Sequence, residues 1–219
     1  MNELKALIDE VKELHGEILA ECQKNEKIKA LYKGCQIFFS PFKKNPDVLF
    51  IGINPGPGYA NANNGKIVEN FEPLEKYGIN VLSEEVLICF REAGKGNIFD
   101  NAVATNGRFF ATDGSEALKS FIANLPENLR EKVKTMSAKW IRTLIEIIEP
   151  RMIMCLGNES FDFLRDNVYP KEMVIIENKN PPLEGKIGNI PIIGCQRRQS
   201  TIINKDAVIE KIRDYFKLL

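Results

Sequence analysis

The feature that most constrains this chain is a continuous apolar run, residues 47–53 (Asp-Val-Leu-Phe-Ile-Gly-Ile), which ends abruptly in Asn54-Pro55-Gly56-Pro57-Gly58. A short run of this kind predicts a strand that is buried on both faces. The two prolines and two glycines that follow can neither continue the strand nor begin a long helix. The segment therefore predicts a sheet covered on both sides, which is typical of α/β proteins.

The rest of the chain alternates strand-like and helix-like segments. Strands are expected over 97–103, 151–157, 173–177 and 190–194. Helices are expected over 2–25, 83–94, 114–124, 127–149 (with a break near 136–137), 159–167 and 205–218. This alternation predicts a three-layer α/β/α sandwich around a mainly parallel sheet of four to five strands. Since no internal repeat or long linker divides the sequence, residues 1–219 are expected to form one domain.

Charge and histidine content exclude several kinds of chemistry. The 30 Lys and Arg balance the 30 Asp and Glu, so the chain is not a strongly basic protein that coats DNA through charge alone. The single histidine, His15, excludes a His-rich metal cage or a relay between two histidines. It follows Leu14 of the first predicted helix, where we expect it at the surface or at the edge of a groove.

Cysteine spacing and hydropathy indicate the compartment. The five cysteines are scattered singly, without a CxxC pair, which favours reduced and buried thiols over a metal site. Residues 2–25 form an amphipathic pattern and not a signal peptide. No apolar stretch reaches the roughly 18 residues of a membrane span. We therefore expect a cytoplasmic protein without a metal, cofactor or membrane partner.

Three segments are expected at the carboxyl ends of strands, where open parallel sheets bind their ligands. They are residues 52–58, Asn101 with the loop after it, and residues 194–200. Glycines at 52–58 let the backbone approach a ligand, and the prolines fix its path. The segment lacks the Lys-Ser/Thr of a phosphate loop and the spacing of a dinucleotide fingerprint. It predicts a rigid display of backbone N–H groups and of the Asn54 side chain, with a simple tight turn as the alternative.

At this point the chain resembles the uracil-DNA glycosylase superfamily, nearest to its mismatch-specific and single-strand-selective branches. Gly52-Ile53-Asn54-Pro55-Gly56, followed by Pro57, is similar to the first active-site motif of that family. Residues 99–105 (Phe-Asp-Asn-Ala-Val-Ala-Thr) resemble the strand whose Asn reads the Watson–Crick edge of uracil. Residues 150–157 resemble the third strand of the family. The resemblance runs in order from about residue 47 to the last predicted helix.

The resemblance implies a DNA-repair enzyme that hydrolyses the N-glycosidic bond of a flipped uracil or related damaged base, without a metal or cofactor. Asn54 would orient the water, Asn101 would read the base edge, and backbone N–H groups between residues 53 and 58 would stabilise the base oxygen. The alternative role for Asn101 is to satisfy backbone groups of its own loop. The implied substrate-binding residues are Gly52, Ile53, Pro55, Gly56, Asn101, and Tyr59 or Phe71 as the aromatic that stacks on the base. For each of the two aromatics, packing in the core is the alternative.

The last family motif differs in this chain. His-Pro-Ser or Asn-Pro-Ser is usual there, whereas residues 195–200 read Cys-Gln-Arg-Arg-Gln-Ser. The resemblance makes DNA the partner, with Gln196 as a hydrogen-bond donor, Arg197 and Arg198 as phosphate contacts, and Ser200 beside them. Arg108, beyond Asn101, is a weaker candidate for substrate contact.

Two other functions remain open from the sequence. The altered last motif and the zero net charge are compatible with a binding module of the same fold that recognises a base, a nucleotide or nucleic acid without cleaving it. A small-molecule hydrolase is the third reading, and no Gly-x-Ser-x-Gly motif supports it.

Overall fold

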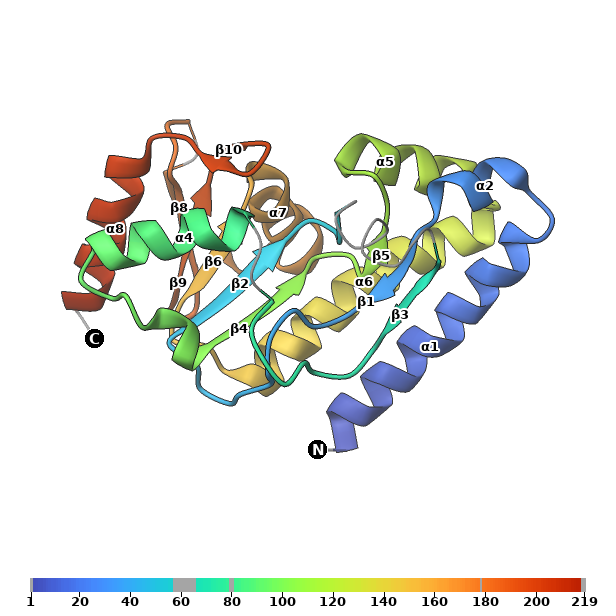
Figure 1. The fold of residues 1–219 in the computed structure, drawn as a ribbon, viewed down its shortest axis with the longest axis horizontal. Helices are drawn as coiled ribbons and strands as arrows, with labels where there is room; N and C mark the ends of the chain where they lie inside the picture. Colours follow the sequence, from blue (N-terminus) through green and yellow to red (C-terminus); the bar gives the residue numbers. More distant parts are fainter. Residues whose placement is uncertain (1, 57–65, 79–80, 178, 218–219) are drawn as a thin grey trace.

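The apolar run at 47–53 forms β2 (Val48–Gly52), an inner strand of a six-stranded sheet (Figure 1). The structure is a computed structural model that describes residues 2–56, 66–78, 81–177 and 179–217. The strand order is β4-β2-β6-β9-β8-β7. The other strands are β4 (Ala102–Asn106), β6 (Ile153–Leu156), β7 (Met173–Glu177), β8 (Leu183–Ile187) and β9 (Ile190–Cys195). The chain is a mixed α/β protein, as the sequence predicts.

The sheet is mixed and larger than predicted. Its first four strands are parallel neighbours, while β8 pairs antiparallel with both β9 and β7. The prediction of four to five strands missed β8, whose sequence Leu-Glu-Gly-Lys-Ile alternates with polar residues and a glycine.

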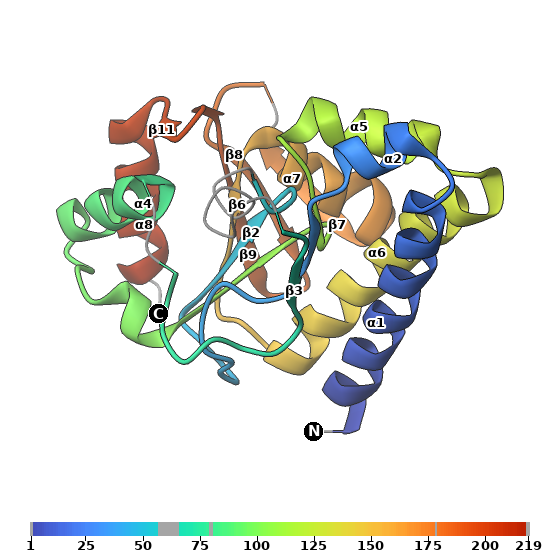
Figure 2. The ribbon, with the colours of Figure 1, turned by 45° about the vertical axis from the view of Figure 1, so that its right-hand side comes forward.

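Helices lie on both faces of this sheet. They are α1 (Asn2–Cys22), α2 (Glu26–Leu31), α4 (Val81–Glu92), α5 (Ser115–Asn124), α6 (Glu127–Ile148), α7 (Asn158–Phe163), which continues into a π-helical turn at Leu164–Val168, and α8 (Lys205–Lys217). Figure 2 shows the sheet between α4 and α8 on one side and α1 and α6 on the other.

The two faces of the strands enter separate hydrophobic clusters, because alternate side chains of a strand point to opposite sides. Leu49 and Ile51 of β2 belong to the cluster that contains α1, α6 and α7 residues, including the fully buried Trp140. Val48 and Phe50 belong to the cluster with α4 and α8. Burial on both faces explains the uninterrupted apolar sequence of β2.

Three predicted boundaries are wrong. The helix expected over 2–25 is followed by a second one, because Asn25 caps α2 by accepting hydrogen bonds from the backbone of Lys27 and Ile28. No break occurs in α6 near residue 136, where Ser137 donates to the Val133 carbonyl at 2.6 Å instead of interrupting the helix. The strand expected over 97–103 is a 3-10 helix (Ile98–Asn101) followed by β4.

A second, small sheet and a hairpin complete the architecture. The sheet has the order β3-β1-β5, from β3 (Val68–Asn70), β1 (Gly34–Gln36) and β5 (Phe110–Ala111). The hairpin pairs β10 (Arg197–Arg198) with β11 (Thr201–Ile202) directly after β9. Among the described residues, no helix is long and apolar enough to cross a membrane.

Candidate functional site

The order of the four parallel strands defines where a ligand is expected. Across the sheet the order of these strands is β4, β2, β6, β9. The chain therefore passes from β2 to β4 in one direction and from β6 to β9 in the other, so the connections that follow β2 and β6 lie on opposite faces of the sheet. In open α/β sheets such a reversal creates a crevice at the carboxyl ends of the two strands, and ligands bind there. Gly52 and Ile53 lie at the end of β2, and Leu156 and Gly157 at the end of β6.

Asn54 is held firmly just beyond β2. Its side-chain Nδ2 donates to the Pro55 carbonyl at 3.0 Å and to Thr112 Oγ1 at 2.9 Å. The hydroxyl of Thr112 in turn donates to the Gly114 carbonyl at 2.9 Å, and the Thr112 amide donates to the Pro55 carbonyl at 3.3 Å. Because both hydrogens of an amide nitrogen are then used, Oδ1 is the atom of Asn54 with capacity to accept a hydrogen bond from a water or a ligand.

The strand β4 brings a second amide to the same edge. Asn106 is the last residue of β4 and pairs in register with Gly52. Its side chain is 7% exposed, and no hydrogen bond joins it to another residue in the described part of the chain. A side chain at Gly52 would collide with Asn106 Oδ1, so the glycine makes the space that this amide occupies.

Backbone contacts continue this strand pair past its end. The Gly107 amide donates to the Gly52 carbonyl at 2.7 Å, and the Arg108 amide donates to the Ile53 carbonyl at 2.9 Å. These bonds fix the loop after β4 against the segment that carries Asn54.

The prediction for Asn101 is wrong in position. Since β4 begins only at Ala102, Asn101 lies at the amino end of the strand, where its carbonyl accepts from the Asp47 amide at 2.9 Å. It lines a polar cavity of about 350 Å³ on that edge together with Asp47 and Arg151. Five residues of strand, about 16 Å at roughly 3.3 Å per residue, separate this edge from Asn106. The asparagine at the carboxyl end of this strand is Asn106, which sequence reasoning did not single out.

Phe71 does not lie beside Asn54. It follows β3, and its ring contacts His15 of α1 edge-on with centroids 5.4 Å apart, below the ammonium group of Lys12 at 5.5 Å. The core-packing alternative thus describes its position. Tyr59, with Pro57 and Gly58, lies outside the described residues.

His15 is buried, contrary to the expectation of a surface or groove-edge position. It is 4% exposed, with Nδ1 at 2.5 Å from the Tyr32 hydroxyl and Nε2 at 3.0 Å from Glu69 Oε1. Because α1 packs on the helical layer with α6, this histidine is a packing residue of α1 and not part of the carboxyl edge.

The last motif forms the β10–β11 hairpin at the carboxyl end of β9. A two-residue turn, with Gln199 in the left-handed conformation at φ 54°, joins Arg198 to Thr201. The Gln196 carbonyl accepts from the Ile203 amide at 2.9 Å, and the side chains of Gln196 and Ser200 are half-buried.

The two hairpin arginines differ in environment. Arg197 turns inward: Nε donates to the Leu156 carbonyl at 2.9 Å and Nη1 to the Gln199 carbonyl at 2.6 Å. Burial lowers its pKa, and the nearby Glu159 opposes that shift. Gly157, at φ 126°, leaves room for this side chain. Arg198 is exposed and is the hairpin cation that faces solvent.

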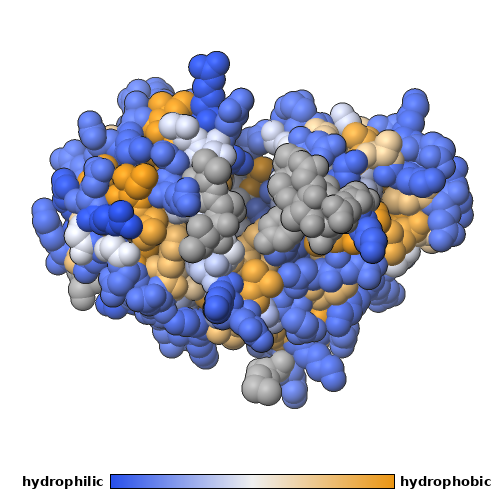
Figure 3. Space-filling model, in the orientation of Figure 1, coloured by the Kyte–Doolittle hydropathy of each residue, from blue (hydrophilic) through white to orange (hydrophobic). Residues whose placement is uncertain are grey.

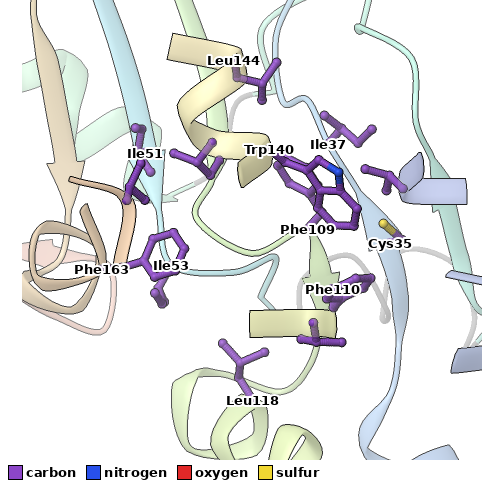
Figure 4. Close-up of a cluster of buried hydrophobic side chains, with 14 of the residues drawn as sticks. Cys35, Ile37, Ile51, Ile53, Phe109, Phe110, Leu118, Trp140, Leu144 and Phe163 are labelled. Carbon is purple, nitrogen blue, oxygen red and sulfur yellow. The ribbon is translucent and has the colours of Figure 1, made fainter. Parts of the chain in front are cut away.

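A cavity of about 280 Å³ lies next to this edge, between α5 and α7. Figure 3 shows the surface hollowed at its upper middle, in the region where Figure 1 places these two helices. Ile53 and Phe163 contribute apolar surface, and Figure 4 shows their side chains next to each other. Arg108 lines the cavity with its guanidinium 4.6 Å above the Phe163 ring.

In comparisons with known proteins, no family model and no curated protein sequence matches the chain. Among the described residues, no group of three His, Cys, Asp or Glu side chains is arranged to hold a metal ion. The site is thus defined by two amides, Asn54 and Asn106, at one sheet edge with a hairpin beside them.

Proposed function

We propose that this chain is a DNA glycosylase-like protein of the uracil-DNA glycosylase superfamily, which binds a flipped base at the carboxyl edge and hydrolyses its N-glycosidic bond. The observation that carries the proposal is the Asn106 amide. Its residue is only 7% exposed, no hydrogen bond joins the amide to another described residue, and it lies against Gly52 beside the position-locked Asn54. The donor and the acceptor of this amide therefore have capacity to bind a base.

The two amides have separate roles in this proposal. Asn106 offers one acceptor and one donor, which together complement the adjacent N–H and C=O groups of a uracil edge. Asn54 Oδ1 accepts a hydrogen bond from the water that attacks the sugar and so orients it. Because an amide is not a strong base, we expect slow turnover. Asn106 takes the role that the resemblance gives to Asn101.

The hairpin supplies the contacts with DNA. Arg198 is exposed next to its turn and can approach a phosphate, with Ser200 in the turn itself. Arg197 holds the hairpin to the end of β6 through the Leu156 carbonyl, so we assign it a positioning role. With few phosphate contacts, affinity for DNA should be modest and sensitive to salt.

The test is cleavage of labelled oligonucleotides that carry U:G, U:A, single-stranded U, hypoxanthine or xanthine, followed by alkaline treatment. We expect a slow strand break at one or more of these bases, which Asn54→Ala and Asn106→Ala abolish and Asn101→Ala leaves unchanged. Absence of breaks on every substrate, with an active glycosylase as the positive control, would contradict hydrolysis.

A binding module of the same fold is the second candidate. The position of the only histidine favours it, because His15 lies on α1, where it contacts Tyr32 and Glu69, and not at the carboxyl edge where it could act on a base. Calorimetric titration with DNA containing the same bases separates the two candidates. Binding that requires Asn106, without any strand break, would identify the module.

We also propose that the fold is a three-layer α/β/α sandwich of the glycosylase type, which the helices on both faces of the sheet support. The five cysteines are free thiols, which supports a reducing compartment such as the cytoplasm.

A further inference from the structure

Arg108 is a half-buried cation with no acceptor. No hydrogen bond or ion pair joins its guanidinium to another described residue, and its Nε is fully buried without a partner. Burial lowers its pKa, and the charge of Glu159 only partly opposes this shift. Arg197, in contrast, has two carbonyl acceptors. The two Nη groups of Arg108 also lack an acceptor among the described residues but are not fully buried, so they are the donors that a ligand in the adjacent cavity can reach.

The guanidinium lines a cavity that suits a flat, largely apolar ligand. Ile53, Leu118 and Ile122 provide aliphatic surface, and the Phe163 ring lies 4.6 Å below the guanidinium carbon. The volume of about 280 Å³ is near the lower end of the roughly 300–1,000 Å³ of ligand pockets, which corresponds to one ring system. Asn54 and Asn106 are not lining residues, so this site is distinct from the two amides.

The charges around the cavity disfavour an anion. Three carboxylates line it, against the two cations Arg108 and Lys119. Two of the carboxylates, Asp162 and Asp166, pair with Arg165, whereas Glu159 pairs with Lys119 at 3.2 Å. When Arg165 is included, three cations balance the three carboxylates, so the cavity needs no further charge and suits a neutral ring. The ligand must therefore present acceptors to Arg108 without carrying a negative charge.

We propose that this cavity binds a 6-oxopurine ring, with the Arg108 guanidinium donating two parallel hydrogen bonds to O6 and N7. An arginine fork matches these two adjacent acceptors in guanine, and the same pair is present in hypoxanthine and xanthine. Adenine presents a donor at position 6, and uracil has no acceptor next to either carbonyl oxygen, because its N3 carries a hydrogen. The ring belongs to a free nucleoside or to a base in a single strand, since both expose this edge.

Calorimetric titration of the full chain with guanosine and inosine tests the site. The matched ligand is 7-deazaguanosine, which has the same shape and O6 but no N7. We expect it to bind roughly 5- to 150-fold more weakly than guanosine, the range for one good bidentate pair. Adenosine and uridine should bind as weakly as the 7-deaza compound.

Two variants extend the test to the protein. Arg108→Lys keeps the charge but loses the fork, and should remove the preference for guanosine over 7-deazaguanosine. Arg91→Lys, at an exposed arginine of α4, is the control and should leave that preference unchanged. If circular dichroism shows that Arg108→Lys does not fold, the comparison of guanosine with 7-deazaguanosine on the natural chain still tests the 6-oxopurine site.

Short thymidine oligonucleotides with one central guanine or 7-deazaguanine distinguish the two sources of the ring. Tighter binding of the guanine oligonucleotide than of guanosine assigns the site to nucleic acid, and the reverse assigns it to a free nucleoside. Equal affinity for guanosine and 7-deazaguanosine, no binding of either source, or competition by inorganic phosphate would overturn the proposal. None of these readouts depends on glycosylase activity.

Discussion

Residue 52 must be a glycine because of its neighbour and not because of its backbone conformation. A Cβ atom at this position would collide with Asn106 Oδ1. Because that oxygen is the end of a side chain, Gly52→Ala should displace the Asn106 amide at little cost in stability. We expect Gly52→Ala and Asn106→Ala to weaken DNA binding or cleavage to a similar extent. The double variant should then be no worse than either single variant.

The measurement is a double-mutant cycle on DNA affinity, with thermal melting of each variant alongside. Additive losses in the cycle would show that Gly52 and Asn106 act independently, which would contradict the packing seen at the end of β2.

Thr112 determines which atom of Asn54 is presented. Its hydroxyl accepts from Asn54 Nδ2 and donates to the Gly114 carbonyl. Thr112→Val keeps the shape but removes both bonds, so the Asn54 amide can rotate. We expect a several-fold fall in the cleavage rate with nearly unchanged affinity, measured in single-turnover assays. Thr112→Ser is the control that keeps the hydroxyl and should retain the rate.

The misplacement of Asn101 shows where sequence patterns are weakest. Ile98 and Phe99 extend the apolar run of β4 toward the N-terminus, so the strand looked as if it began at Asn97. In the structure these residues form a 3-10 turn, and the strand continues to Asn106. The polar residues Thr105 and Asn106, followed by Gly107, were the sequence signal that marks the carboxyl end of β4. Asn54 was predictable because prolines and glycines mark its position without ambiguity.

At the scale of elements, α1 is attached to α6 by Glu10. This carboxylate accepts from Lys139 Nζ at 2.7 Å and from the buried Trp140 Nε1 at 2.9 Å. Partial burial raises its pKa, but these two hydrogen bonds outweigh the effect, and the pKa of Glu10 lies below its ordinary value. Glu10 therefore stabilises the fold above its unfolded-state pKa, and this contribution is lost as the pH falls through the lower folded-state pKa.

We expect the Glu10→Gln variant to be less stable than the natural chain at pH 7. Its free energy of unfolding should also fall less between pH 7 and acidic pH, as measured by urea denaturation at each pH. Glu3→Gln, at an exposed carboxylate of α1, is the control. If the free energy of unfolding fell equally with pH in Glu10→Gln and in the natural chain, Glu10 would not be a source of the acid sensitivity.

The Tyr32 hydroxyl joins the start of β1 to α1 through His15. Both side chains are buried, so Tyr32→Phe leaves His15 Nδ1 without its partner. We expect a loss of about 1–3 kcal/mol in the free energy of unfolding, the usual cost of an unpaired buried polar group. Tyr215→Phe, which removes a longer, partly buried contact of 3.5 Å with Glu184, should cost less. Equal losses for the two variants would rule out a special contribution from Tyr32.

The elements that sequence reasoning found were those with long or uniform patterns, such as α6, α8 and β2. It missed β1, β3 and β5, because two or three residues carry too little periodicity to be recognised. These strands form only through partners distant in sequence, such as Gly34 with Val68 and Ala111.

At the scale of the whole molecule, the five thiols report on global packing. All are buried, and burial raises their pKa, for Cys89 to about 11. Since the thiolate is the reactive form, a thiol reagent such as Ellman's should label the folded chain very slowly at pH 7.5. In urea it should label five equivalents at once. Fast labelling of a folded sample would show that part of the core opens readily.

The carboxyl edge is built from the ends of all four parallel strands, and so from segments that are far apart along the chain. Asn54, Asn106, Gly157 and Arg197 reach this edge only when the sheet between them is complete. No fragment that ends before residue 197 can therefore hold the complete edge, and under the proposed function activity would appear only after the last hairpin has been synthesised. A ligand that binds at this edge only in the folded chain would consequently raise the melting temperature of the entire chain, by an amount that grows with the logarithm of its concentration above Kd.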